Sequence, residues 1–194
     1  MADVDRELLD RATIEVGMSE GDSEIEAVVV GAGALRGIVL HKLMEELLTG
    51  LLVPDLAHLT DRASTLTQEA IVAGATVPDP SEIAATALRT FSHEKLKPYI
   101  AKLVPEIPLF GARSDTVLVS ARADAIAFEA GVPIAAFDWK SDVAPTMGDH
   151  DAYASQLLEY LELIGAAKGA VVYMTSGDVR WVHRASGANG KLPV

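Results

Sequence analysis

The hydrophobic and polar positions follow a helical period in the first half of the chain. The clearest case is Ala34–Leu48, where apolar residues form a wide stripe that ends at Gly50. Three further stretches with this period predict helices near Leu56–Ala73, Ser81–Arg89 and His93–Leu103. Ser81 follows two prolines and is expected to be the N-cap of its helix.

After Pro105 the pattern changes from helical to extended. Short apolar runs between turn residues predict a meander of three buried strands at Val117–Val119, Ala123–Phe128 and Ile134–Phe137. A long helix is expected from about Asp149 to Ile164, before two last strands at Ala170–Met174 and Val179–His183. This order of elements predicts an α/β domain with a mixed central sheet and helices on both faces.

The first 26 residues differ from the rest in composition. They contain one helical stretch, Val4 to Ala12, followed by a polar segment that includes two glycines. We expect an acidic arm, made of a marginal helix and a linker, whose acids are solvated. Residues 27–194 then form a single domain, with a helical part at about 34–104 and a sheet core at about 105–184.

Composition limits the possible functions. The chain has 194 residues, 49% of them apolar and none of them cysteine, which excludes thiolate catalysis, a cysteine zinc site and an iron–sulfur cluster, and fits the cytoplasm. No apolar run approaches the roughly 20 residues that cross a bilayer, so no membrane partner is expected.

The net charge of -12 would normally argue against a nucleic-acid partner. However, residues 1–26 carry -7 and the residues from Lys168 onward carry +3, so the total says little about the rest of the chain.

Two carboxylates and a lysine lie on two apolar strands joined by a short turn. The two-residue period of a strand places Asp138 and Lys140 on one face and Trp139 on the other, with Asp124 on the preceding strand. Such a pair is either a weak surface ion pair or part of a divalent-metal site. The run Ile134–Phe137 is apolar throughout and therefore interior, which makes charges at its end costly unless a metal or a partner compensates them.

Five segments with distinctive spacing lie in a fixed order along the chain. They are Gly37-Ile-Val-Leu-His41 followed by Glu45, Glu106-Ile-Pro-Leu, Ala121-Arg-Ala-Asp124, Asp138-Trp-Lys140-Ser-Asp142 and Gln156-Leu-Leu-Glu-Tyr160. In this order the sequence resembles the PD-(D/E)XK nuclease superfamily, specifically the nuclease domain of the RecB and AddA helicase–nucleases. The resemblance covers roughly residues 37 to 174. Two departures are Ala121, where the family often has glycine, and the absence of a Walker A motif from the sequence.

The resemblance implies a restriction-endonuclease-like core and an exonuclease that hydrolyses DNA with Mg²⁺ or Mn²⁺. Such a nuclease acts with a helicase domain or subunit in DNA end processing and recombinational repair. Asp124 and Asp138 would be carboxylate ligands of the metal, the main-chain carbonyl of Trp139 a further ligand, and His41 would complete the site. Lys140 would orient or activate the attacking water and stabilise charge on the phosphate.

The other motif residues have both a structural and a functional interpretation. Gln156 and Tyr160 share one helix face and reach either the active site and DNA backbone or a structural hydrogen bond to the sheet. Glu45 is either a partner of the His41 imidazole or a solvated acid. A histidine on an apolar helix is more often a core residue, but the family motif favours the metal role for His41. Asp142 is expected in a loop.

Two other functions compete with nuclease activity. A catalytically inactive nuclease-like module would only bind DNA or mediate assembly, but the complete set of motif residues argues against it. The segment Ala27–Gly37 imitates the fingerprint of a dinucleotide-binding oxidoreductase. Its third glycine comes one position late, and helical pattern follows where a second strand should appear.

Overall fold

The computed structural model describes residues 12–16, 33–70, 77–114 and 117–185. A six-stranded mixed sheet forms its centre, in the order β1-β6-β5-β4-β3-β2. The strands are β1 (Ala12–Val16), β2 (Leu103–Ser114), β3 (Val117–Glu129), β4 (Val132–Lys140), β5 (Lys168–Tyr173) and β6 (Asp178–Arg184). The helices are α2 (Ala34–Leu48), α3 (Leu56–Ala70), α4 (Pro80–Phe91), the short 3-10 helix η1 (Ile100–Lys102) and α5 (Met147–Ile164).

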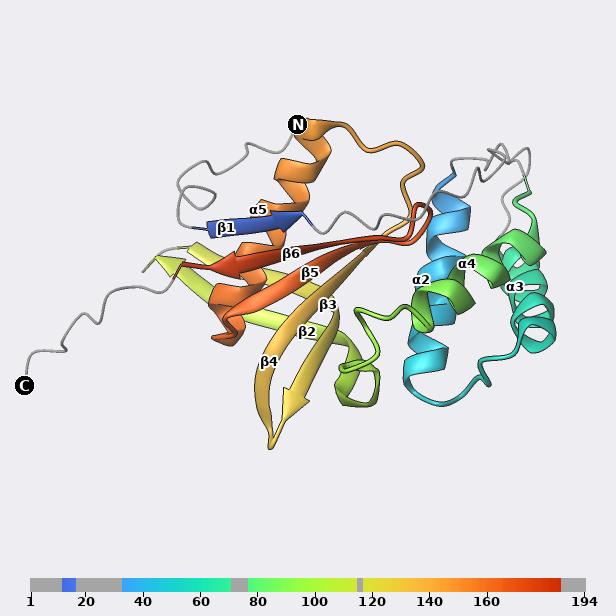
Figure 1. The fold of residues 1–194 in the computed structure, drawn as a ribbon, viewed down its shortest axis with the longest axis horizontal. Helices are drawn as coiled ribbons and strands as arrows, with labels where there is room; N and C mark the ends of the chain where they lie inside the picture. Colours follow the sequence, from blue (N-terminus) through green and yellow to red (C-terminus); the bar gives the residue numbers. More distant parts are fainter. Residues whose placement is uncertain (1–11, 17–32, 71–76, 115–116, 186–194) are drawn as a thin grey trace, which may run out of the picture.

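Helices cover the sheet on both faces, which confirms the α/β fold class and the helical N-terminal region expected of a restriction-endonuclease-like core. Helices α2, α3 and α4 form one group beside the sheet, and α5 lies apart from them against the strands (Figure 1). Two separate hydrophobic clusters result, one between the α2–α4 group and the sheet and one under α5. All neighbouring strands are antiparallel except β4 and β5, which are parallel.

The one parallel pair depends on α5, because parallel strands need a crossover connection. Thr146 caps the start of α5: its hydroxyl accepts a hydrogen bond from the Asp149 N–H, and the Asp149 carboxylate accepts one from the Thr146 N–H. Gly165 ends the helix in the left-handed conformation with φ 74°, which glycine adopts without steric cost. The expected helix is therefore confirmed, although it begins two residues earlier than Asp149.

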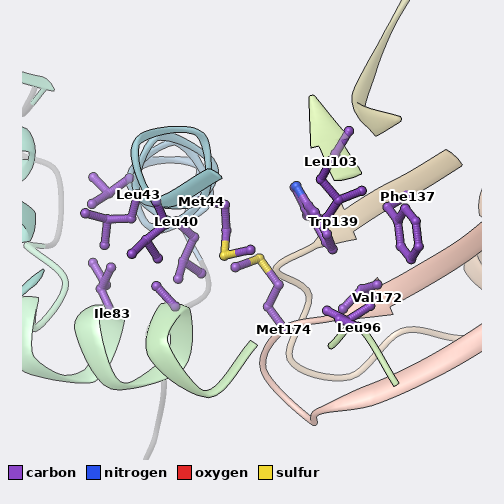
Figure 2. Close-up of a cluster of buried hydrophobic side chains, with 14 of the residues drawn as sticks. Leu40, Leu43, Met44, Ile83, Leu96, Leu103, Phe137, Trp139, Val172 and Met174 are labelled. Carbon is purple, nitrogen blue, oxygen red and sulfur yellow. The ribbon is translucent and has the colours of Figure 1, made fainter. Parts of the chain in front are cut away.

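The cluster under the α2–α4 group connects the helices to the sheet. Met44 of α2 and Met174, which follows β5, lie between the helices and the strands in Figure 2. Trp139 is 2% exposed in this cluster, and its ring stacks on Phe137 with 6.0 Å between the ring centroids. Trp139 is thus a core residue of the face opposite Lys140, as expected.

Two helix predictions need correction. Helix α4 is capped by Asp79, whose carboxylate accepts a hydrogen bond from the Ser81 N–H, and Pro80 is its first residue, so Ser81 is not the N-cap. Proline suits that position because the N–H it lacks would have no partner there. The prediction of a helix at His93–Leu103 was wrong. The segment forms turns and η1, and β2 begins at Leu103.

The strands also differ from the sequence-based expectation. Val117–Val119 and Ala123–Phe128 belong to one continuous strand, β3, and the first strand of the meander is β2. In the acidic arm, Ala12–Val16 pairs antiparallel with β6 as an edge strand, so this part is not linker. Its five residues alternate polar and apolar, a short pattern that the surrounding acids concealed.

Some expectations fall outside the described residues. These are the helix at residues 4–11, the end of the helix expected near Leu56–Ala73, at residues 71–73, and the strand that a dinucleotide-binding fold would need at residues 27–30. Within the described ranges, no helix is both long and apolar enough to span a membrane.

Candidate metal centre

Three potential metal ligands from three different elements converge at one point. His41 of α2, Glu106 of β2 and Asp124 of β3 each offer one ligand atom, and these atoms lie within 4.8 Å of one another. The His41 Nδ1 lies 3.4 Å from an oxygen of Asp124. Two carboxylates and one imidazole suit a divalent ion that takes oxygen and nitrogen ligands, so the residues fit Mg²⁺ or Mn²⁺. The structure thus brings together His41 and Asp124, two of the residues that the sequence analysis selected.

The position of Asp124 follows from the way in which β3 and β4 separate. Their paired residues end at Ala125 and Phe137. Beyond this point the N–H of Trp139 donates to an Asp124 carboxylate oxygen at 2.7 Å. A side chain therefore replaces a strand carbonyl as the acceptor, and this bond fixes the carboxylate while its other oxygen faces His41.

Glu106 was quoted in a motif but given no role, and the structure places it in the centre. It lies between the pairs Pro105–Ala125 and Ile107–Ala123 of the β2–β3 ladder, opposite Asp124. Its φ of 56° is in the left-handed region, which is costly for a residue with a Cβ. Such strain persists where the surrounding structure imposes it, often at functional sites. An acid between two prolines at a strand entry was the available signal in the sequence.

Asp138 and Lys140 lie on one face, as the two-residue period predicted. The Lys140 Nζ is 2.8 Å from an Asp138 oxygen, and the two side chains are 17% and 5% exposed, so the pair is not a surface ion pair. The Lys140 ammonium also donates to the Gln156 side-chain oxygen at 3.2 Å and lies 4.4 Å from the centre of the Tyr153 ring. Three groups therefore hold the ammonium in place.

The charges of this region shift two pKa values. Burial raises the pKa of Asp138 to about 6, although the Lys140 ammonium opposes the rise. Burial lowers the pKa of His41, but the hydrogen bond and negative charge of Asp124, together with the charge of Asp138, outweigh it and leave the pKa above its ordinary value. Both shifts describe the protein without a bound cation, which would favour ionised carboxylates and a neutral imidazole.

Gln156 and Tyr160 of α5 are connected to this centre through Lys140. The Gln156 amide donates to the Tyr160 hydroxyl at 2.7 Å, while its oxygen accepts from Lys140. Burial, followed by the negative charge of Asp138, raises the pKa of Tyr160 to about 12, so the phenol stays protonated. The pair therefore supports the lysine instead of serving only as a link between α5 and the sheet.

The other predicted residues have different partners. Glu45 pairs with Lys42 at 2.7 Å, so it is not bound to the His41 imidazole. Asp142 lies in the loop after β4, as expected, and accepts a hydrogen bond from Tyr153 at 2.9 Å. Tyr153 was not predicted, although it lies three residues before Gln156 and therefore on the same helix face. Asp138 is not one of the three grouped ligands, and its role and that of the Trp139 carbonyl stay predictions.

Arg36, another residue that was not predicted, holds α2 against the end of β4. It is 2% exposed, and its guanidinium donates to both carboxylate oxygens of Glu82 at 2.7 and 2.9 Å. It also donates to the Ser141 carbonyl at 3.0 Å, directly after Lys140. Gly37 allows this close approach, because a Cβ there would lie 2.9 Å from the Ser141 hydroxyl. Arg36 thus sets the separation between the helix of His41 and the strand of Lys140.

A cleft of about 780 Å³ opens beside the three grouped ligands. His41, Glu106 and Arg122 line it on the side of the candidate metal centre. Ile38, Leu66 and Ala70 contribute apolar surface from α2 and α3. The cleft therefore leaves one side of the candidate metal centre open to solvent.

Comparisons with known proteins do not identify the chain. No protein-family model matches it. No curated protein matches it either. A solved structure described as "Crystal structure of SSO0001" is similar over 80% of each chain, with 21% sequence identity and a TM-score of 0.39. This similarity is too low to support a function.

Proposed function

We propose that the protein is a Mg²⁺- or Mn²⁺-dependent deoxyribonuclease of the RecB and AddA type. The observation that carries this proposal is the convergence of His41, Glu106 and Asp124 from three elements beside the Asp138–Lys140 pair. Metal-binding carboxylates next to a fixed ammonium suit the hydrolysis of a phosphodiester, in which negative charge develops on the phosphate.

The side chains have distinct roles in this proposal. His41, Glu106, Asp124 and Asp138 would hold the ion, which when bound acts as a Lewis acid and lowers the pKa of a bound water. Lys140 is restrained by Asp138 and Gln156, so its ammonium is oriented before the substrate arrives. It would orient the attacking water or donate a hydrogen bond to a phosphate oxygen.

The proposal includes a partner. The nucleases that the sequence resembles act on DNA ends together with a helicase. Without the -7 of the acidic arm, residues 27–194 still carry a net charge of -5, which gives little general attraction for DNA. We therefore assign delivery of the strand to a helicase domain or subunit and cleavage to this chain. In an assay of the chain alone, we expect cleavage that needs high protein concentration or low salt.

The test is cleavage of end-labelled single- and double-stranded DNA with Mg²⁺, Mn²⁺ or a chelator. Cleavage should need the metal, and Asp124→Asn and Lys140→Gln should lower it by at least about 100-fold. The matched controls are Asp61→Asn and Lys97→Gln, which alter exposed side chains outside the centre. No cleavage by the wild type with either metal, even at high protein concentration and low salt, or full cleavage by the Asp124 and Lys140 variants, would refute the proposal and favour an inactive DNA-binding module.

A further inference from the structure

We infer that Arg122 binds a phosphate of the substrate backbone and that Glu106 holds this arginine until a metal engages the carboxylate. This inference rests on the proposed function and extends it to substrate binding. The Arg122 Nη1 lies 3.2 Å from a Glu106 oxygen, and its side chain is 67% exposed at the cleft. Glu106 therefore belongs to the candidate metal centre, with His41 and Asp124, and at the same time pairs with the arginine.

The position of Arg122 suits a backbone contact near the metal. Arg122 and Asp124 are two residues apart on β3, so their side chains leave the same face, roughly 7 Å apart along the strand. A planar guanidinium can donate two parallel hydrogen bonds to a phosphate. An anion placed between the metal and Arg122 would be attracted by both.

The other cations that line the cleft are less available. His41 is one of the three grouped ligands. Lys42 is paired with Glu45 at 2.7 Å, a shorter contact than the one between Arg122 and Glu106. Among the lining residues, Arg122 is thus the cation whose paired carboxylate, Glu106, would also bind the metal.

Metal binding would release Arg122 for the phosphate. A divalent ion bound to Glu106 neutralises the charge that attracts the guanidinium and repels the guanidinium directly. The phosphate then replaces Glu106 as the anionic partner. Binding of metal and binding of substrate are coupled through one carboxylate, and each should strengthen the other to the same degree.

The experiment measures binding separately from cleavage. The probe is a short fluorescent DNA oligonucleotide with a phosphorothioate backbone, which keeps the negative charges and resists hydrolysis. Its affinity for the full chain is measured by anisotropy with Mg²⁺ and with chelator, over a range of salt concentrations. The proteins are the wild type, Arg122→Gln, Glu106→Gln, the double variant, and Lys97→Gln as a control for the loss of one positive charge.

With Mg²⁺, Arg122→Gln should weaken binding about tenfold. It should also reduce the slope of the logarithm of affinity against the logarithm of salt concentration by about 0.7–0.9, while Lys97→Gln has little effect on either quantity. With chelator, Arg122→Gln should change binding by less than about twofold, because Glu106 holds the arginine. In the Glu106→Gln background, the same substitution should weaken binding severalfold even with chelator. Equal effects of Arg122→Gln and Lys97→Gln with Mg²⁺, or an Arg122 effect that is independent of Glu106, would overturn the inference.

Cleavage assays separate this inference from the nuclease proposal. If Arg122→Gln cleaves natural DNA with an unchanged KM, the phosphate contact is wrong and the nuclease stands. If the wild type binds the probe through Arg122 but cleaves no DNA with either metal, the contact stands and the nuclease proposal fails.

Discussion

The backbone N–H of Trp139 donates a hydrogen bond to the carboxylate of Asp124 at 2.7 Å, across the point where β3 and β4 separate. One carboxylate thus completes the sheet and also belongs to the candidate metal centre. Structure and chemistry at Asp124 can be separated by substitution, because an asparagine oxygen still accepts the N–H while an alanine cannot.

We expect Asp124→Asn to keep nearly the wild-type free energy of unfolding without metal. Asp124→Ala should be less stable by about 1–3 kcal/mol, because the Trp139 N–H loses its acceptor. Both variants should lose metal affinity, since each removes a negatively charged ligand. Urea unfolding in chelator and calorimetric Mn²⁺ titration measure the two effects. Equal stability of the two variants would show that the hydrogen bond contributes nothing.

The raised pKa of Asp138 predicts a pH dependence of stability without metal. Burial raises this pKa to about 6, so the folded protein binds the proton more tightly than the unfolded chain. The resulting stabilisation is present below the ordinary pKa of about 4 and is lost as the pH rises through about 6. Relative to Asp138→Asn, which does not titrate, the wild type should lose on the order of 3 kcal/mol across that interval.

Unfolding of both proteins in urea and chelator, from pH 4 to pH 8, provides the measurement. The difference in free energy of unfolding between the wild type and Asp138→Asn should change between pH 4 and 6 and be constant above pH 7. A difference that is flat across the whole range would mean that Lys140 fully compensates the burial of the Asp138 carboxylate.

Local periodicity predicted the parts of the structure that depend on local rules. The apolar stripe of α2 gave its bounds, and strand alternation placed Asp138 beside Lys140. Periodicity alone did not reveal β2, because its prolines and the apolar spacing before it obscure the strand pattern, although the sheet core was expected to begin at about residue 105. The proximity of Glu106 to Asp124 depends on strand register and on one unusual φ, and neither is encoded by a period.

The left-handed backbone at Glu106 predicts an unusual order of stability. At φ 56° any Cβ is unfavourable, so Glu106→Gly should be more stable than Glu106→Ala by about 1 kcal/mol. At the exposed strand residue Ser120, alanine should be the more stable of the same two substitutions, because glycine costs conformational entropy. Thermal unfolding of the four variants compares the sites. If alanine were favoured at both, Glu106 would not be strained.

A last prediction separates the positioning role of Arg36 from its contribution to stability. Arg36→Met removes a buried guanidinium that joins α2 to Glu82 and to the Ser141 carbonyl, so it should destabilise the protein by about 3 kcal/mol. Arg62→Met is the control, because Arg62 forms a bidentate pair with Glu46, at 2.6 and 2.8 Å, between α2 and α3, although its side chain is more exposed than that of Arg36.

Both variants should unfold at lower urea concentration, but the effect on the centre should differ. Arg36 fixes the distance between His41 and the end of β4, so its loss should lower Mn²⁺ affinity on the order of tenfold at a temperature where the protein stays folded. The guanidinium of Arg62 is bonded to Glu46 of α2, away from β4 in sequence and partner, so Arg62→Met should bind Mn²⁺ like the wild type. Equal Mn²⁺ affinities of the two variants would show that Arg36 contributes to stability but does not position the centre, because a general loss of stability would then account for every effect of its removal.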